Sequence, residues 1–174
     1  MPERLRPITL TNVRLFGRNF AGLATKYNPA GGVRRFCVIL PEDKAERMIE
    51  EGWHVKYLKP REEDENVPRP FIEVEIKFGK YPPRIVMIGS RGKVELNQAS
   101  CSLLDSEPAM NVDLVLRPYQ WEVNGNSGVK AYLKSIFYTI YEDELDLKYA
   151  NVPDSATQAM FDQDVAEAAT FDGL

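Results

Sequence analysis

The strongest constraint on the fold is a pair of long alternating segments joined by a short turn. Residues 111–123 and 128–141 alternate apolar and polar side chains, and Asn124-Gly125-Asn126-Ser127 lies between them. Alternation with a period of two is typical of a half-buried strand, and Asn-Gly between two such segments is typical of a β-hairpin. The sequence therefore predicts a long hairpin in the C-terminal half of the chain.

Shorter alternating segments precede this hairpin. In residues 71–78, Ile72, Val74, Ile76 and Phe78 lie on one expected face. We expect strands at 8–20, with a bulge near residues 11–12, and at 33–40, 53–58, 71–78 and 84–88. A helix is expected over 41–52, where Pro and acidic residues begin the segment and Gly52 ends it. A second short helix is expected at 98–104. About seven strands with short connections predict a mostly-β barrel or sandwich.

One face of the predicted hairpin carries cations interleaved with aromatic rings. Any even-length loop pairs odd-numbered with even-numbered positions, so two triplets share a face: Arg117, Tyr119 and Trp121, and Lys130, Tyr132 and Lys134. Aromatic rings stack on bases and Lys or Arg neutralise phosphates, which together suit sequence-independent binding of single strands. The alternative is a sandwich core, although three cations on one face are difficult to bury.

Three further mixed groups strengthen the nucleic-acid interpretation. The first strand places Arg14, Phe16 and Arg18 two residues apart and so on one expected face, and another cluster holds Lys56, Tyr57 and Lys59. Lys26 and Tyr27 lie in a Gly-rich loop that could close over a bound strand. These residues extend the expected stacking set to Phe16, Tyr57 and Tyr27, and the expected phosphate contacts to Arg14, Arg18, Lys26, Lys56 and Lys59.

Charge is distributed unevenly along the 174 residues. Residues 1–141 hold 21 basic and 17 acidic side chains, whereas residues 142–174 hold one basic and nine acidic ones, so a net charge of +4 precedes one of −8. We expect a flexible acidic tail that competes with DNA and recruits partners, because two phrases in it combine an aromatic ring with carboxylates: Phe161, Asp162 and Asp164, then Phe171 and Asp172. The alternatives are a solubilising terminus and an amphipathic helix packed on the domain.

Other function classes find less support. Two cysteines 64 positions apart and a single histidine give no metal-ligand spacing, and no nucleotide-binding or nucleophile motif is present, so no cofactor or metal is expected. No apolar run is long enough to span a membrane and no secretory signal begins the chain, which predicts a cytoplasmic protein. Two alternatives stay open: a metal-dependent nuclease using Asp64, Glu75 and Lys77, and a protein-interaction module without DNA affinity.

Three phrases in the chain resemble a known family. Residues 17–22 (Gly-Arg-Asn-Phe-Ala-Gly), 52–62, and 117–125 continuing to 129–134 are similar to the small single-stranded DNA-binding proteins of tailed bacteriophages. The resemblance implies an OB-like β-barrel over residues 1–149 and an acidic tail over 150–174. It also implies non-catalytic protection of DNA in phage replication or recombination, in the host cell cytoplasm, with replication or recombination proteins bound through the tail. A homodimer is compatible with the sequence. The seven expected strands exceed the five of an OB barrel.

Overall fold

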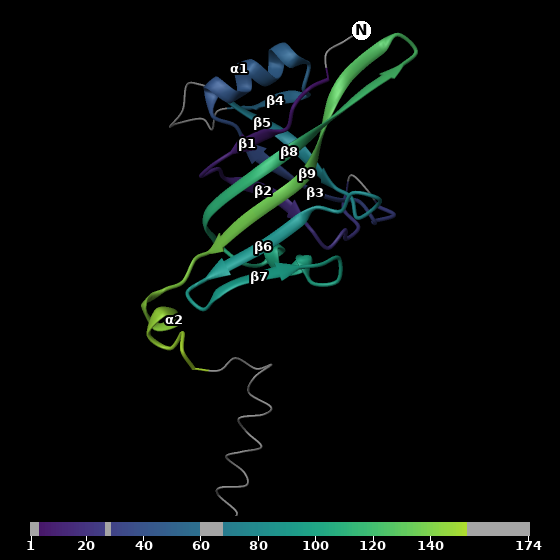
Figure 1. Cartoon of the computed structure of the whole chain (residues 1–174). Helices are drawn as coiled ribbons and strands as arrows, with labels where there is room; N and C mark the ends of the chain where they lie inside the picture. Colours follow the sequence, from purple (N-terminus) through teal and green to yellow (C-terminus); the bar gives the residue numbers. More distant parts are fainter. Residues whose placement is uncertain (1–3, 27–28, 60–67, 153–174) are drawn as a thin grey trace, which may run out of the picture. The chain divides into compact units, whose positions relative to one another are not determined.

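The fold is organised around a long antiparallel hairpin in the computed structural model, which describes residues 4–26, 29–59 and 68–152. Strands β8 (Ala109–Val123) and β9 (Asn126–Ile140) form this hairpin (Figure 1). Asn124 and Gly125 form its two-residue turn with φ values of 50° and 81°. Positive φ at both positions is the signature of a type I′ turn, whose twist matches that of the flanking strands. The predicted hairpin is confirmed, with a turn two residues shorter than expected.

The described residues contain nine strands in one mixed sheet. The main path runs β1-β8-β9-β5-β3-β2; in addition, β4 pairs with β5, and β6 pairs with β7 and β9. The remaining bounds are β1 Ile8–Leu10, β2 Leu15–Asn19, β3 Arg34–Ile39, β4 Val55–Leu58, β5 Arg69–Ile76, β6 Arg84–Gly89 and β7 Gly92–Leu96. The mostly-β class is confirmed and the arrangement is consistent with an OB-like fold. Because β1 and β2, the two ends of this path, do not pair with each other, the sheet does not close into a complete barrel.

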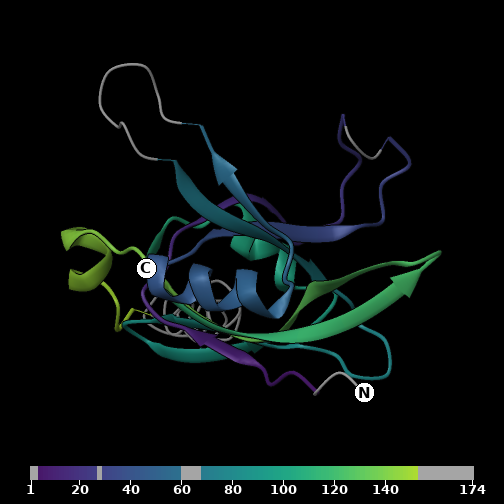
Figure 2. The same cartoon turned by 90° about the horizontal axis from the view of Figure 1, so that it is seen from above.

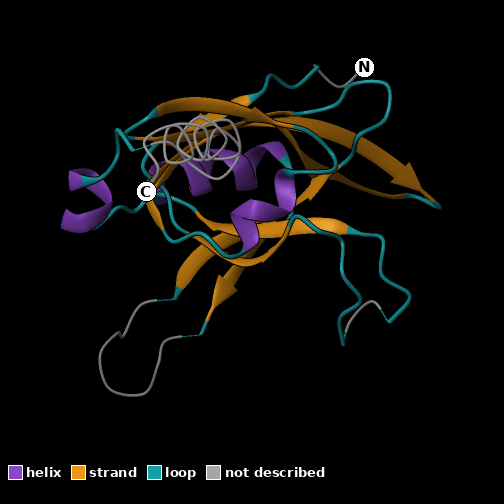
Figure 3. Ribbon diagram, turned by 90° about the horizontal axis from the view of Figure 1, so that it is seen from below, coloured by secondary structure: helices purple, strands orange, loops and turns teal. Residues whose placement is uncertain are grey.

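One helix covers an end of the core. Helix α1 (Glu42–Glu51) buries Ala45 and Met48 and ends at Gly52, whose φ of 92° is the left-handed conformation that glycine adopts easily. Seen from above and from below, α1 lies between the layer of β8 and β9 and the layer of β3 and β5 (Figures 2 and 3). The predicted helix is confirmed.

The core lies between these layers and follows the predicted alternation. On β5, Ile72, Val74 and Ile76 are buried, and on the hairpin Leu114, Leu116 and Leu133 are buried. Phe20 stacks on Phe36 with ring centroids 5.3 Å apart. Side chains at alternating positions point to opposite faces of a strand, so the intervening residues of β5, β8 and β9 form an outer face. This outer face positions the candidate site.

The N-terminal strand is divided. Residues 8–20 form β1 and β2, which pair with different neighbours: β1 with β8, and β2 with β3. Between them Asn12 adopts a φ of 50° and its backbone N–H donates to Asp113 Oδ1 at 2.8 Å. This change of partner is larger than the bulge that we expected. Together with β7, which the sequence did not predict, it raises the strand count from seven to nine.

A short 3₁₀ helix fastens the loop that follows β2. Helix η1 (Cys101–Asp105) lies inside the helix expected at 98–104, except for its last residue. The Asp105 carboxylate accepts hydrogen bonds from the backbone N–H groups of Phe20 and Ala21, at 2.7 and 3.0 Å. Arg34 also donates to the carbonyl oxygen of Phe20 and to Cys101 Sγ. The root of the Gly-rich loop is therefore held by η1.

The chain separates into two compact units. One holds Met1–Gly89 with Lys93–Tyr141, and the other holds Ser90–Gly92 with the segment from Glu142 onward. In the second unit, the backbone N–H and hydroxyl of Ser90 both donate to the Glu142 carboxylate at 2.6 Å, and these bonds lower the pKa of Glu142. Helix α2 (Glu144–Lys148) follows, with a capping box between Asp143 and Asp146. The predicted division into 1–149 and 150–174 stays a prediction. Among the described helices, none has the length and apolar character needed to cross a membrane.

Candidate nucleic-acid interface

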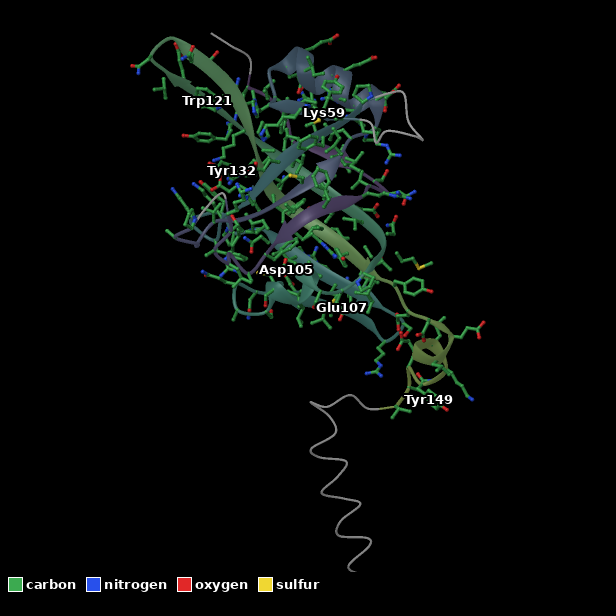
Figure 4. All side chains as sticks on the ribbon, turned by 180° about the vertical axis from the view of Figure 1, so that it is seen from behind. Lys59, Asp105, Glu107, Trp121, Tyr132 and Tyr149 are labelled. Carbon is green, nitrogen blue, oxygen red and sulfur yellow. The ribbon has the colours of Figure 1, made fainter. Side chains whose placement is uncertain are left out.

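The register of the hairpin brings five of the six residues of the two predicted triplets onto one face, while Lys134 lies at a register shift. Arg117 lies opposite Tyr132, Tyr119 opposite Lys130, and Trp121 opposite Gly128. Directly opposed residues of an antiparallel pair share a face. Tyr119 is 52% exposed and Trp121 is 38% exposed, so neither ring belongs to the core. The hairpin presents aromatic surface outward (Figure 4).

Tyr132 is the centre of a cluster of cations. The side-chain charges of Lys77, Arg117 and Lys130 lie 5.3, 5.6 and 5.7 Å from its ring centroid, within cation–π range. Tyr119 meets the same ring edge-on at 5.5 Å. Arg117 also lies 5.6 Å from the ring of Tyr81. The cluster therefore joins an exposed aromatic row to three positive charges.

Two members of this cluster, Lys77 and Tyr81, are not among the DNA contacts expected from the sequence. Lys77 entered only as part of the nuclease alternative, and Tyr81 was not singled out. Strand β5 aligns Glu75 with Tyr132, which brings the Lys77 ammonium over the Tyr132 ring, 5.3 Å from its centroid. The alternation of β5 showed that Lys77 points outward, but only the long-range pairing of β5 with β9 shows what it meets.

Trp121 lies against the backbone of Gly128. A Cβ atom added at Gly128 would meet the indole ring of Trp121 at 2.9 to 3.1 Å, closer than van der Waals contact. The missing side chain at position 128 therefore creates the space that the indole occupies. This contact holds one face of the ring against the hairpin.

Two acidic side chains interrupt the positive charge on β5. Glu75 forms an ion pair with Lys130, and Glu73 forms one with Arg35 at 3.3 Å. The hydrogen bond from Lys130 to Glu75 raises the pKa of Lys130, so Lys130 is charged at neutral pH and already has an anionic partner. The centre of the outer face is thus mixed in charge.

The face continues across β5 toward β4 and β2. Lys56 is paired with Phe71, and Phe71 packs edge-on against Phe16 with centroids 5.2 Å apart. Tyr57, next to Lys56 in the strand, points to the opposite face and is 54% exposed. Lys59 follows the end of β4 and is exposed (Figure 4). Lys134 is exposed at the register shift of β9, where it lies between Leu133 and Ser135.

Arg18 and Arg14 lie away from this face. The Arg18 guanidinium donates to the carbonyl oxygens of Leu104 and Glu107, at 2.9 and 2.6 Å, and to the hydroxyl of Tyr138. Figure 4 shows Glu107 far along the molecule from Trp121 and Tyr132. The reason is Gly17, whose φ of 59° lies where three residues of β2 oppose two of β3, so the alternation reverses after Phe16. The prediction that Arg18 shares a face with Phe16 is wrong. Arg14 is exposed and lines a separate cavity of about 510 Å³ with Arg18.

Comparison with known proteins decides the family. A family model described as "Putative phage ssDNA-binding domain" matches residues 2–173. The chain belongs to this family. Single-stranded DNA binding, the activity predicted from the hairpin, is thus the activity of its family, and the resemblance seen in the sequence is confirmed. No curated protein sequence matches the chain.

Solved structures of phage single-stranded DNA-binding proteins have a similar fold. The protein of bacteriophage Enc34 in complex with single-stranded DNA is 14% identical, with a TM-score of 0.53 over 79% of this chain and 88% of that one. A C-terminal truncation of the Enc34 protein gives a TM-score of 0.52 at 14% identity, over 79% and 87% of the two chains. At this identity the likeness concerns the fold.

The structure describes some of the remaining predicted residues, and others lie outside the described ranges. Lys26 is exposed in the Gly-rich loop. Tyr27, Asp64 and the tail residues Phe161, Asp162, Asp164, Phe171 and Asp172 lie outside the described residues. Of the other nuclease candidates, Glu75 pairs with Lys130 and Lys77 contacts Tyr132. Within the described ranges, no three His, Cys, Asp or Glu side chains gather as metal ligands would.

Proposed function

We propose that the chain binds single-stranded DNA with little dependence on sequence along the outer face of β8, β9 and β5. Tyr119, Trp121 and Tyr132 stack on bases, while Arg117 and Lys77 contact phosphates. The observation that carries this proposal is the Tyr132 ring with three cations within 5.7 Å, beside the exposed rings of Tyr119 and Trp121. Stacked bases and neutralised phosphates are what such a surface offers to a flexible strand.

A single strand fits this surface better than a duplex does. Exposed rings stack on the flat faces of bases, which a duplex keeps inside its own stack. Helices that read duplexes enter the major groove with basic residues, whereas α1 carries five acidic side chains and two basic ones. The bacteriophage Enc34 protein, whose fold is similar, was solved in complex with single-stranded DNA, which agrees with the proposal.

Fluorescence anisotropy with labelled oligo-dT and a matched duplex, at two salt concentrations, tests the proposal. We expect tight, salt-sensitive binding to oligo-dT and weaker binding to the duplex. Trp121→Ala should weaken oligo-dT binding by about 1–3 kcal/mol, the contribution of one stacked base, without unfolding the protein. Tyr141→Ala is the matched control, because Tyr141 is 58% exposed and follows the end of β9 away from the cluster. Equal loss in both variants, or no binding at low salt, would instead favour a protein-interaction module.

The acidic tail has a proposed role of its own. Residues 142–174 could extend about 110 Å, far enough to reach the outer face of the same molecule. Tethered carboxylates and rings then compete with DNA at high effective concentration and, once displaced, dock on replication or recombination proteins. The full chain with Asp162→Asn, Asp164→Asn and Asp172→Asn should bind oligo-dT more tightly than the unmodified chain at low salt. Unchanged affinity would contradict the competition.

A further inference from the structure

The sheet forks at Glu73, and a pocket lies at the fork. Strand β5 pairs with β4 as far as Ile72, and with β9 from Val74 onward, along the same edge. The connection from α1 to β4 meets β9 beside this point, where Trp53 bridges Val129 and the backbone N–H of His54 donates to the Val129 carbonyl. The pocket has a volume of about 330 Å³, at the lower end of the range of about 300–1,000 Å³ that is usual for small-ligand sites.

The walls of this pocket combine an aromatic ring with hydrogen-bond acceptors. Trp121, Gly128 and Lys130 line it from the hairpin, and Glu73, Glu75 and His54 line it from the sheet and the α1–β4 connection. The Lys130 ammonium is already paired with Glu75, which leaves the Glu73 carboxylate as the acceptor that faces a ligand. The Glu73 side chain is 39% exposed although it pairs with Arg35, so its carboxylate is accessible to a ligand. The pocket therefore offers a ring to stack on and a carboxylate that can only accept hydrogen bonds.

This chemistry selects one kind of group from a DNA strand. Carboxylates repel phosphates, so the backbone of a bound strand is directed toward the cations Arg117 and Lys77 and a base toward the pocket. A carboxylate accepts a hydrogen bond from the amino group N4 of cytosine. Thymine presents the acceptor O4 at the same place, which a carboxylate disfavours.

We propose that the pocket at the fork of β5 binds one base of the strand and prefers cytosine to thymine through Glu73. The inference rests on the proposed binding of single-stranded DNA and adds a preference for base to it. Trp121 stacks on the base whichever it is, so the pocket adjusts affinity without abolishing binding to other sequences. Glu73 acts as the specificity-determining residue.

Competition between unlabelled homopolymers of equal length against labelled oligo-dT, with the full chain, tests this preference. We expect oligo-dC to compete about tenfold better than oligo-dT, as one hydrogen bond to a charged group allows. Glu73→Gln should bring the ratio close to one, because a glutamine amide both accepts from cytosine N4 and donates to thymine O4. Glu122→Gln is the matched control: it removes the same charge from an exposed hairpin residue that does not line the pocket, and should keep the ratio of the unmodified chain.

Each outcome bears on the pocket separately from the proposed function. Failure of both homopolymers to bind would remove the DNA-binding proposal and this one with it. Strong binding with a ratio near one in the unmodified chain, or a preference that survives Glu73→Gln, would overturn the pocket while leaving DNA binding intact. Oligo-dU separates a steric effect of the thymine methyl group from hydrogen bonding. If oligo-dU competes as well as oligo-dC, the carboxylate is not the discriminating group.

Discussion

Replacing Gly128 with alanine is expected to displace Trp121 without disturbing the fold. The added Cβ would stand 2.9 Å from Cζ2 and 3.1 Å from Cε2 and Nε1 of the indole, so the ring must withdraw by several tenths of an ångström. Trp121 is 38% exposed and is not part of the core, so it has solvent to move into. Gly128 does not have a positive φ, and alanine fits its backbone.

The two consequences differ in sign and size. Glycine inside a strand destabilises a protein by roughly 0.5–1 kcal/mol relative to alanine, so the free energy of unfolding should stay constant or rise slightly. Loss of one stacking contact weakens DNA binding by roughly 1–3 kcal/mol, which corresponds to about 5- to 150-fold in affinity for oligo-dT. Urea denaturation measures the first quantity and anisotropy the second. The loss should not exceed that of Trp121→Ala, and the double variant should bind like Trp121→Ala alone, because both changes remove the same contact.

Gly79→Ala is the matched control. A Cβ at Gly79 meets no atom within 4 Å and the position has no positive φ, so this variant adds the same methyl group in open space. It should bind and unfold like the unmodified chain. If Gly128→Ala binds oligo-dT normally while Trp121→Ala does not, the position of the indole against Gly128 is irrelevant to binding and the argument fails.

Other changes test separate parts of the structure. Arg117→Ala should reduce the slope of log affinity against log salt by about 0.7, the value for one phosphate contact on a single strand, and an unchanged slope would remove Arg117 from the interface. Asp105→Ala leaves two backbone N–H groups without their acceptor and should lower the free energy of unfolding by about 1–3 kcal/mol in urea; no loss would contradict its anchoring role. Glu75 raises the pKa of Lys130 above its value in the unfolded chain. The ion pair therefore stabilises the fold fully at pH values below the pKa of Lys130 in the unfolded chain. This stabilisation is lost as the pH rises through the pKa of Lys130 in the folded chain. Glu75→Gln should consequently reduce the loss of stability in alkaline urea titrations, and an identical profile would refute the coupling.

The hairpin could be predicted from sequence because all its determinants are local. Asn-Gly fixes a turn with an even number of residues, and an even turn alone places Arg117, Tyr119 and Trp121 on the face of Lys130 and Tyr132. The exact turn length did not matter, since two and four residues give the same parity. Register within a hairpin is a property of neighbouring residues.

The position of Arg18 and the contact of Lys77 with Tyr132 could not be predicted, because both depend on residues far apart in the chain. Gly17 reverses the alternation of β2, and Arg18 then meets carbonyl groups more than 80 positions away. Nothing local distinguishes this glycine from one in a regular strand. In the same way, Lys77 joins Tyr132 only because β5 pairs with β9 in parallel. The phrase at residues 17–22 was recognisable as a family pattern, although its residues fasten β2 and its loop and lie outside the proposed DNA surface.

The two-residue turn at the hairpin tip has a consequence for how such proteins change over evolutionary time. Beyond Arg117 and Tyr132, opposed residues pair in strict register as far as Val123 and Asn126. Inserting a single residue in one strand without a new β-bulge would turn every outer ring beyond it to the other side. Length changes that keep the strict register of the arm add residues to both strands together and in twos, each step lengthening the arm by about 6.8 Å. Arm length in descendants of this chain is therefore expected to vary in discrete increments, each contributing one further opposed pair of side chains on the outer face.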